Sequence, residues 1–344
     1  MALPSNLGAY LPTSSTARRR GGLLGVAALA LVGSAVLVNR RATRAELDYP
    51  PRGSFVTTDG VRLHYIARGA GESVVFLHGN GAMVEDILIS GLFDKTAEHY
   101  RAIAIDRPGF GHSERPRDRA WTATSQAALL VRMFSLLGIE RPIVVAHSWA
   151  TLVALSIALD HPDAIRGLVL ASGYYFPTAR TDAALFSPPA VPLVGDLFSY
   201  TVAPVIGEAI SPTLIKKMFA PQPVSPRFDR EFPMGLALRP SQIKAFAQDS
   251  SHMIAAARQL SSRYSTLRCP TVIMAGDADR IVDVQRQAHR LHGALAGSRL
   301  DVLQGAGHMI HHLDPDRILR AVDLISTGGI TLASVHAEAA TWGT

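Results

Sequence analysis

Short apolar runs alternate along most of the chain with segments whose apolar residues recur at helical spacing. We interpret the runs as buried strands because they are short, bounded by polar or glycine-rich segments and almost free of charge. Residues 121–137 and 151–159 lie between such runs and have the apolar spacing of helices. The expected strands are Val74–Leu77, Tyr100–Ile105, Pro142–Val145, Ile165–Ala171, Thr271–Ala275 and Arg299–Leu303. This alternation predicts an α/β fold with a mostly parallel sheet and helices on both of its faces.

A different pattern marks the entry to this sheet. Residues 55–58 and 61–66 are rich in β-branched and aromatic side chains, and they flank the dipeptide Asp59-Gly60. Because an Asp-Gly pair favours a two-residue turn with positive φ angles, we expect an antiparallel hairpin at this position.

The alternation stops between Tyr174 and Arg268 and resumes afterwards. This stretch contains several prolines and two amphipathic segments, residues 212–219 and 242–261. We interpret it as an insertion within the α/β core. The residues after Gly328 have no strong pattern, so residues 328–344 are expected to form a loosely ordered tail.

The N-terminal region has a long uncharged segment, Gly21–Val38, after a polar leader (residues 1–20) that ends in three arginines. Its length is at the lower limit for crossing a bilayer, so we expect a transmembrane signal anchor over 21–38. A cleaved signal peptide with Gly33-Ser34-Ala35 as its processing site, or a buried helix, are the alternatives. Arginines flank both ends; the N-terminal cluster favours a globular part outside the cytoplasm. Residues 39–53, charged and proline-containing, are expected to form a linker.

Composition narrows the possible classes of protein. The chain has 344 residues, 48% of them hydrophobic, which is enough for one large core. Its single cysteine, Cys269, excludes an internal disulfide and a cysteine-based metal site, and we expect it in the core. The net charge is +6, but residues 1–50 carry +4 of it through six arginines and two acidic residues. The nearly balanced remainder gives no indication of a nucleic-acid partner.

The strand that ends near Val145 leads to a serine, Ser148, which is followed at once by a helical pattern. A serine at the apex of a sharp strand-to-helix turn is a nucleophile elbow, because the turn exposes the hydroxyl. The N-terminus of the helix also directs backbone N–H groups to where an oxyanion could form. The usual motif is G-x-S-x-G, whereas this chain has Ala146 and Ala150 in place of the two glycines.

A nucleophilic serine needs a histidine as its base and an acid that orients the histidine. Residues 276–282 form a polar loop with two aspartates after the strand at 271–275, and residues 304–309 carry a histidine after the strand at 299–303. The chain order serine, acid, histidine is the one expected for a nucleophile elbow in this setting. Upstream, the glycine-rich loop at 78–81 could supply a second backbone N–H to the oxyanion.

Taken together, these motifs resemble those of the α/β-hydrolase family, in the branch that also holds epoxide hydrolases, haloalkane dehalogenases and cofactor-free haloperoxidases. The motifs that carry the resemblance are His78–Gly81, Asp106–Ser113, the elbow at Ser148, Gly276–Asp279 and Gly305–His308. The resemblance covers roughly residues 54–327. It implies an α/β-hydrolase core over 54–173 and 269–327, with the inserted residues 174–268 as a helical cap that roofs the site.

The resemblance also implies roles for individual residues. Ser148 resembles the nucleophile, His308 the general base and Asp279 the orienting acid. The backbone N–H groups of Asn80 and Trp149 resemble the oxyanion hole. No metal or cofactor is implied.

Neighbouring residues offer alternatives. Asp277 is the alternative acid, with Asp279 then a turn residue. His311 and His312 are interpreted as surface or helix-entry residues, and the side chain of His147 is expected to point away from the substrate. His78 and His112 are expected to hold loop structure. Candidate pocket residues, each of which could equally pack cap against core, are Tyr174, Tyr175, Phe176, Met218, Phe219 and Met309.

The implied function is that of a membrane-anchored serine hydrolase that cleaves a small-molecule ester or related acyl compound. A serine at position 148 suits acyl transfer, whereas the dehalogenases and epoxide hydrolases of this branch use an aspartate there. One alternative is a haloperoxidase-like perhydrolase or a C–C bond hydrolase with the same triad. Another is a ligand-binding protein with a weak or vestigial site, because the two alanines could strain the elbow.

Overall fold

The computed structural model describes residues 14–178, 188–191 and 194–330, apart from the side chains of residues 14–24, 27, 28 and 188. An eight-stranded sheet forms its centre, in the order β1-β2-β4-β3-β5-β6-β7-β8. The first three strands in this order pair antiparallel and the others pair parallel, as the sequence predicts for most of the sheet. The strands are β1 (Ser54–Thr58), β2 (Val61–Arg68), β3 (Ser73–Leu77), β4 (Arg101–Ile105), β5 (Ile143–His147), β6 (Gly167–Ala171), β7 (Thr271–Gly276) and β8 (Ser298–Leu303).

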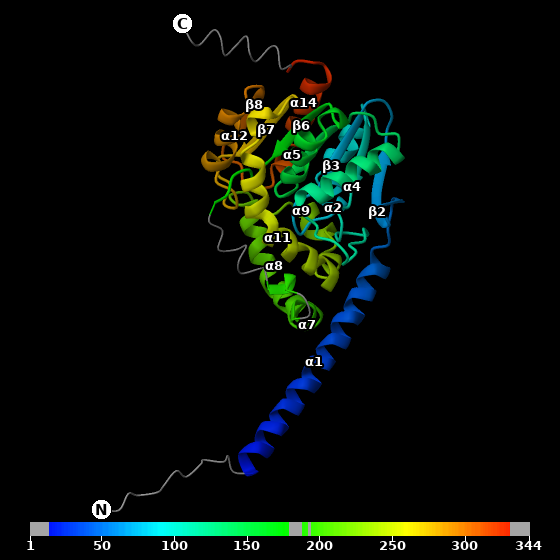
Figure 1. The fold of residues 1–344 in the computed structure, drawn as a ribbon, viewed down its shortest axis with the longest axis vertical. Coiled ribbons are helices and arrows are strands. Elements are labelled where there is room, and N and C mark those ends of the chain that lie inside the picture. Colours follow the sequence, from blue (N-terminus) through cyan, green and yellow to red (C-terminus); the bar gives the residue numbers. More distant parts are fainter. Residues whose placement is uncertain (1–13, 179–187, 192–193, 331–344) are drawn as a thin grey trace, which may run out of the picture.

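Both faces of the sheet are covered by helices, which explains why its central strands are continuous apolar runs. In β3, Val75 and Leu77 point into one core and Val74 and Phe76 into the other. The first core is closed by α4 (Ala123–Leu136), α5 (Ala150–Asp160) and α12 (Arg290–Ala294), and the second by α2 (Val84–Ile89), α3 (Leu92–Ala97) and α14 (Pro315–Ser326). Figure 1 shows α2, α4, α5, α12 and α14 around the sheet. Cys269 is buried in the first core, as predicted.

The predicted hairpin is confirmed. β1 and β2 pair antiparallel with Thr58 opposite Val61, and only Asp59 and Gly60 lie between them. Both turn residues have positive φ, 49° and 73°, which is the conformation that an Asp-Gly turn favours.

Helices occupy the described part of the predicted insertion, between β6 and β7. They are α7 (Val194–Thr201), α8 (Ala203–Phe219), α9 (Pro226–Glu231), α10 (Met234–Ala237) and α11 (Pro240–Ser261). Two of them extend further than their sequence patterns: α8 begins well before residue 212 and includes Pro212, and α11 begins at Pro240. The far end of α11 packs into the first core through Met253, Ala257 and Leu260, so this helix joins the inserted region to the sheet.

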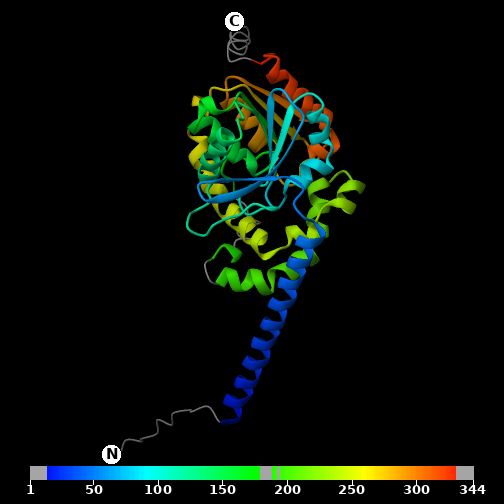
Figure 2. The same cartoon turned by 90° about the vertical axis from the view of Figure 1, so that its right-hand side faces the viewer.

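The N-terminal helix α1 (Ser14–Asp48) projects from the globular part, as Figures 1 and 2 show. It continues into the expected linker as far as Asp48, because helix-forming residues continue to that point and the next prolines along the chain are at positions 50 and 51. An ion pair of 2.9 Å between Arg44 and Asp48, one helical turn apart, supports this extension. The expected tail from residue 331 onward and most of the polar leader lie outside the described residues.

The predicted transmembrane helix is not supported. Among the described residues, no helix is long and apolar enough to cross a bilayer, and part of the predicted span (21–24, 27 and 28) has no described side chains. One side of the last third of that span packs against protein, while Val36 and Leu37 on it are exposed. Ser34 Oγ donates a hydrogen bond of 2.7 Å to the carbonyl oxygen of Thr201 at the end of α7, and Val38 is buried. The predicted domain boundaries remain predictions.

Candidate active site

Ser148 lies at the turn between β5, which ends at His147, and α5, which begins at Ala150. Its φ angle is +54°, in the left-handed region that residues other than glycine seldom adopt. The turn is held by a hydrogen bond of 2.9 Å from the Ser148 N–H to the carbonyl oxygen of Ala171 in β6. The structure therefore has the strained strand-to-helix turn that the apolar pattern predicts.

The elbow accommodates two alanines where the usual motif has glycines. Ala146 and Ala150 are both fully buried, with their methyl groups packed in the first core. The close approach occurs instead at Gly79 in the glycine-rich loop. A Cβ atom on residue 79 would lie 3.0 Å from His147 Nδ1 and 3.3 Å from Ser148 Cβ. The loop therefore lies directly against the serine, where any side chain at position 79 would be crowded.

Three side chains predicted from the sequence meet at this turn. His308 Nε2 lies 3.0 Å from Ser148 Oγ, and His308 Nδ1 lies 2.7 Å from Asp279 Oδ2. The side chains of His308 and Asp279 are each only 2% exposed. An imidazole held between a hydroxyl and a buried carboxylate can remove the hydroxyl proton as the oxygen attacks.

The two aspartates of the 276–279 loop have different partners. Asp279 Oδ1 accepts hydrogen bonds from the N–H groups of Ile281 (2.7 Å) and Val282 (3.0 Å), which aims its other oxygen at His308. Asp277 is exposed and accepts a hydrogen bond of 2.6 Å from the N–H of Gly305. Of the two candidate acids, only Asp279 contacts the histidine.

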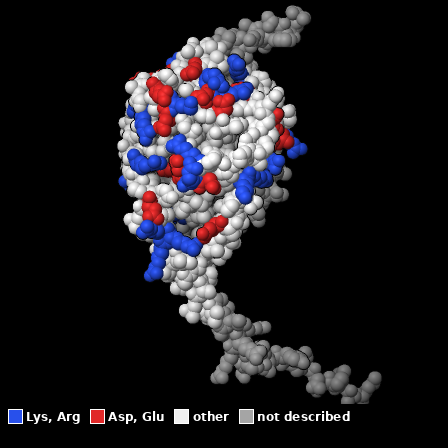
Figure 3. Space-filling view, turned by 180° about the vertical axis from the view of Figure 1, so that it is seen from behind, with Lys and Arg blue, Asp and Glu red and all other residues white. Residues whose placement is uncertain are grey.

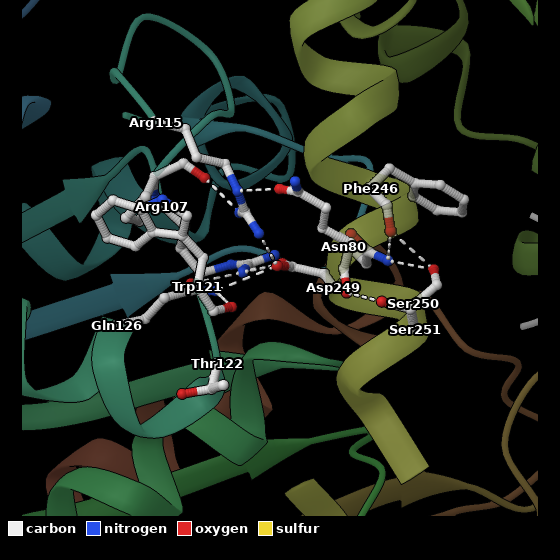
Figure 4. Close-up of polar contacts among 12 residues, drawn as sticks. Asn80, Arg107, Arg115, Trp121, Thr122, Gln126, Phe246, Asp249, Ser250 and Ser251 are labelled. Carbon is white, nitrogen blue, oxygen red and sulfur yellow. Dashed lines mark hydrogen bonds and ion pairs between the residues drawn. The ribbon is translucent and has the colours of Figure 1, made fainter. Parts of the chain in front are cut away.

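The loop with Asn80 is tied to α11. Asn80 Nδ2 donates to the carbonyl oxygen of Phe246 (3.1 Å) and to the hydroxyl of Ser250 (3.0 Å), one turn apart on that helix. Figure 4 shows Asn80 between these two residues. The contacts fix the loop whose backbone N–H is the predicted oxyanion donor, and the donor role of Asn80 and Trp149 remains a prediction.

The same helix carries a buried carboxylate that sequence reasoning missed. Asp249 accepts hydrogen bonds from Arg107 (2.6 Å), Arg115 (2.9 Å) and Gln126 (3.2 Å), as Figure 4 shows. Arg107 and Asp249 are fully buried. The carbonyl oxygen of Asp249 also accepts a bond of 2.9 Å from Trp149 Nε1. Asp249 thus joins the residue after the serine to two arginines, and no local sequence signal marks a partner over a hundred positions away.

His78 holds loop structure, as predicted. Its Nε2 accepts a hydrogen bond of 3.0 Å from the N–H of Arg107, and its Nδ1 lies 2.8 Å from the carbonyl oxygen of Gly79. Burial, with the nearby charge of Arg107, lowers the pKa of His78 to about 4. The ring is therefore neutral at physiological pH, which matches one accepted and one donated hydrogen bond. The N–H of His112 donates to Asp106 (3.0 Å), which also lies 2.7 Å from His64 Nδ1.

Three further histidines differ from their sequence interpretation, His147 fully and His311 and His312 only in their burial. His147 does not point away from the site: its Nε2 lies 3.2 Å from the carbonyl oxygen of His308, and it lines the cavity described below. His311 and His312 do enter a short helix, α13 (Ile310–Leu313), but their side chains are 2% and 3% exposed. Both bind Asp86, which lies 225 and 226 positions earlier in the chain.

Asp86 and its two histidines form a buried polar group. Burial opposes ionisation of Asp86, but its interactions with His311 and His312 hold its pKa well below the usual range. Burial lowers the pKa of His311, although the carboxylate of Asp86 acts in the opposite direction. Its Nδ1 is buried without a hydrogen-bond partner.

A cavity of about 610 Å³ opens over Ser148 and His308. Most of its wall is apolar and comes from the inserted helices, including Phe198, Ile206, Ile210, Leu214, Ile215 and Phe246. Of the six candidate pocket residues, Met218 and Met309 line the cavity. Tyr174, Tyr175 and Phe176 are buried in the first core, and Phe219 packs on Phe228. The cavity can accept an apolar group and place its end at the serine.

Comparisons with known proteins agree with this architecture. The family model described as the alpha/beta hydrolase fold matches residues 72–315. A haloalkane dehalogenase 2 of Mycobacterium tuberculosis is 25% identical over 284 residues, which cover 80% of this chain and 94% of the relative. The crystal structure of the enol-lactonase from Burkholderia xenovorans LB400 superposes with a TM-score of 0.65 at 18% identity, over 80% of this chain and 100% of that one. The crystal structure of a membrane phospholipase A, described as a bacterial virulence factor, superposes with a TM-score of 0.59 at 21% identity. The superposition covers 90% of this chain and 99% of that one.

Proposed function

Because this chain belongs to the α/β-hydrolase fold family, we propose that it is a serine hydrolase that cleaves an ester or a related acyl compound. One observation carries the proposal. The Ser148 hydroxyl, the His308 imidazole and the Asp279 carboxylate are joined in series at 3.0 and 2.7 Å below an apolar cavity. This arrangement favours nucleophilic attack by the serine on a carbonyl carbon.

The reaction would proceed in two halves. Ser148 Oγ attacks the carbonyl while His308 takes its proton, and Asp279 stabilises the resulting imidazolium. The N–H groups of Asn80 and Trp149 are the proposed donors to the tetrahedral oxyanion. His308 then passes the proton to the leaving alcohol, which leaves an acyl group on Ser148. Water, activated by His308, releases the acid and restores the serine.

The residue type at position 148 separates this chemistry from that of relatives with other reactions. Dehalogenases and epoxide hydrolases of this branch attack carbon with an aspartate and form an alkyl ester. A serine hydroxyl forms an acyl ester instead, so we propose acyl transfer in spite of the similarity to a haloalkane dehalogenase.

We propose that the acyl group is apolar and that the protein works at a lipid surface. Ile206 and Leu214 on α8 line the cavity, yet they are 45% and 36% exposed, which extends the apolar wall to the outside. On α1, Leu29 and Val32 are 74% and 62% exposed. Figure 3 shows the described surface of α1 white beyond the charged residues at its base. The structural similarity to a membrane phospholipase A also favours lipid-like substrates.

The first test is labelling of the full chain in detergent with a fluorescent fluorophosphonate. We expect labelling of the native protein and none of Ser148→Ala, because the probe reacts only with an activated serine. The variant Ser156→Ala, which removes a buried hydroxyl of α5 bonded to the Leu152 carbonyl, is the matched control and should label normally.

Absence of labelling in a folded native protein would contradict the proposal and favour a ligand-binding role. If labelling succeeds, esters of short and long acyl chains should be cleaved in preference to a β-diketone. The opposite preference would favour the C–C bond hydrolase alternative.

A further inference from the structure

A cluster of metal-ligating side chains lies outside the Ser148–His308–Asp279 series. Asp86 on α2 lies with one carboxylate oxygen 3.1 Å from His311 Nε2 and with the other 2.8 Å from His312 Nε2. One ligand atom from each of the three side chains can be chosen so that all lie within 4.8 Å of one another. Their side chains are 1%, 2% and 3% exposed.

The convergence of these groups has an electrostatic cost. A carboxylate buried away from water requires compensation by charge or by strong hydrogen bonds. The carboxylate of Asp86 lies within hydrogen-bond distance of two imidazoles. The other nitrogen of His311, Nδ1, is buried without a hydrogen-bond partner. An imidazole nitrogen is a common metal ligand, and a divalent cation would compensate the charge of the buried carboxylate.

We propose that Asp86, His311 and His312 bind one divalent transition-metal ion, with Zn²⁺ as the best match. Two imidazole nitrogens and one carboxylate oxygen are a common zinc donor set. Bonds of about 2.0–2.2 Å in a tetrahedral site place neighbouring ligand atoms roughly 3.3 Å apart. The observed contacts of 2.8 and 3.1 Å join the two imidazole nitrogens to different oxygens of Asp86, so binding requires rotation of the carboxylate and the rings to bring one oxygen and both nitrogens around the ion.

The site has an open side. Asp86 is among the residues that line the cavity over Ser148, so an ion and a completing water can enter from there. The ion would not contact the reacting atoms directly. The His311 ring packs against the His147 ring at 4.4 Å between centroids, and His147 in turn bonds to the carbonyl oxygen of His308. The proposed ion would therefore stabilise the segment that carries His308, and this inference does not depend on the proposed function.

The test is metal binding by the full chain in detergent, with any affinity tag removed and bound metal stripped by a chelator. After dialysis against ZnCl₂, we expect one zinc per chain by elemental analysis. We expect Co²⁺ in place of zinc to give the visible absorption of tetrahedral coordination. His312→Gln and His311→Gln should each weaken binding by at least about 10-fold.

A matched control is His292→Gln, which removes a histidine of α12 that bonds to Ser298 and should leave zinc binding unchanged. Circular dichroism identifies variants that fail to fold. Because Asp86 is buried, Asp86→Asn is used in the binding test only if it folds. The two histidine variants replace the imidazole with a smaller polar side chain.

Stoichiometric binding that both histidine variants lose would support the site. Native protein that binds no zinc, or zinc that remains in both variants, would overturn it. In that case the two histidines are hydrogen-bond donors to Asp86 alone.

Discussion

At the scale of single residues, the site depends on the carboxylate that contacts His308 and on the orientation of its two oxygens. The Ile281 and Val282 N–H groups hold one oxygen of Asp279 and leave the other for the imidazole. Asp277, two positions earlier, lies at the protein surface and accepts a hydrogen bond from the Gly305 N–H. The backbone of one short loop therefore decides between two aspartates that the sequence left as alternatives.

This difference predicts different results for two conservative substitutions. Asp279→Asn should lower kcat for ester hydrolysis by about 10²–10⁴-fold, because an amide favours the wrong tautomer of His308. Asp277→Asn should change kcat less than about 3-fold, since an exposed amide oxygen can still accept from Gly305. Steady-state kinetics on one ester measures both. Equal losses, or a greater loss in Asp277→Asn, would refute the assignment of the acid.

Glu85 predicts a pH dependence of stability. Burial, together with the nearby charge of Asp106, raises its pKa to about 7, although Arg52 lies 3.8 Å away. Below about pH 4.5 the group is protonated in both the folded and the unfolded chain. Between there and pH 7 the unfolded chain has lost the proton while the folded chain keeps it, so stability falls as pH rises.

Glu85→Gln should therefore raise the free energy of unfolding at pH 8 by up to about 3 kcal/mol and change little at pH 4. Thermal melting of both proteins at the two pH values measures the effect, with the exposed Glu98→Gln as the control. A stabilisation that is equal at both pH values would show that packing, not ionisation, is responsible.

Local motifs made the serine, the histidine and the preferred acid predictable. Each lies in the loop that follows a strand, where a parallel sheet gathers its loops, so motif order pointed to this edge of the sheet. The preference for Asp279 over Asp277 came from the family resemblance. The partners of Asp249 and Asp86 were not predictable. Arg107 and Asp249 are 142 positions apart, and His311 is 225 positions from Asp86. Such pairs depend on the packing of separate elements, which no local pattern encodes.

At the scale of elements, α11 connects the inserted region to the site. Its Phe246 carbonyl and Ser250 hydroxyl hold Asn80, its Asp249 holds Arg107, and its far end packs in the first core. The sequence predicted an amphipathic helix at this place. It did not predict that Gln242, Asp249 and Ser250 of this helix are buried, because polar residues on a helix are usually solvated.

Asp249→Asn should lower the free energy of unfolding by about 3–5 kcal/mol, because two guanidinium groups then lack their buried anion. Chemical denaturation measures the loss. The control is Asp301→Asn, which breaks a part-exposed pair with Arg317 and should cost less than about 1 kcal/mol. A loss in Asp249→Asn no larger than in this control would show that the buried network contributes little to folding.

At the scale of the whole molecule, the sequence predicted the sheet and the insertion but not the course of α1. Uncharged composition over 21–38 favoured a membrane span, and charge over 39–53 favoured a linker. One continuous helix covers most of both, because helix propensity does not stop where hydropathy changes. The contact of Ser34 with α7 depends on a tertiary surface that hydropathy cannot reveal.

The exposed apolar residues of α1 predict attachment to lipid. The full chain should float with phospholipid vesicles, and the double substitution Leu29→Lys with Val32→Lys should reduce the bound fraction at least about 10-fold. Leu136→Lys, at a position 60% exposed on α4, is the matched control and should float like the native protein. Native protein that stays with the soluble fraction, or a double variant that floats equally well, would refute attachment through this surface.

The anchorage of α1 determines orientation as well as location. Ser34 bonds to the end of α7, Arg41 pairs with Glu208 on α8 at 2.7 Å, and Glu46 pairs with Arg239 before α11 at 2.7 Å. A helix of this length extends about 50 Å, and these contacts attach it rigidly to the helices that surround the cavity. Any tilt of its free end turns the cavity mouth by the same angle. The direction from which a substrate can approach Ser148 is thus set by whatever holds the first turns of α1.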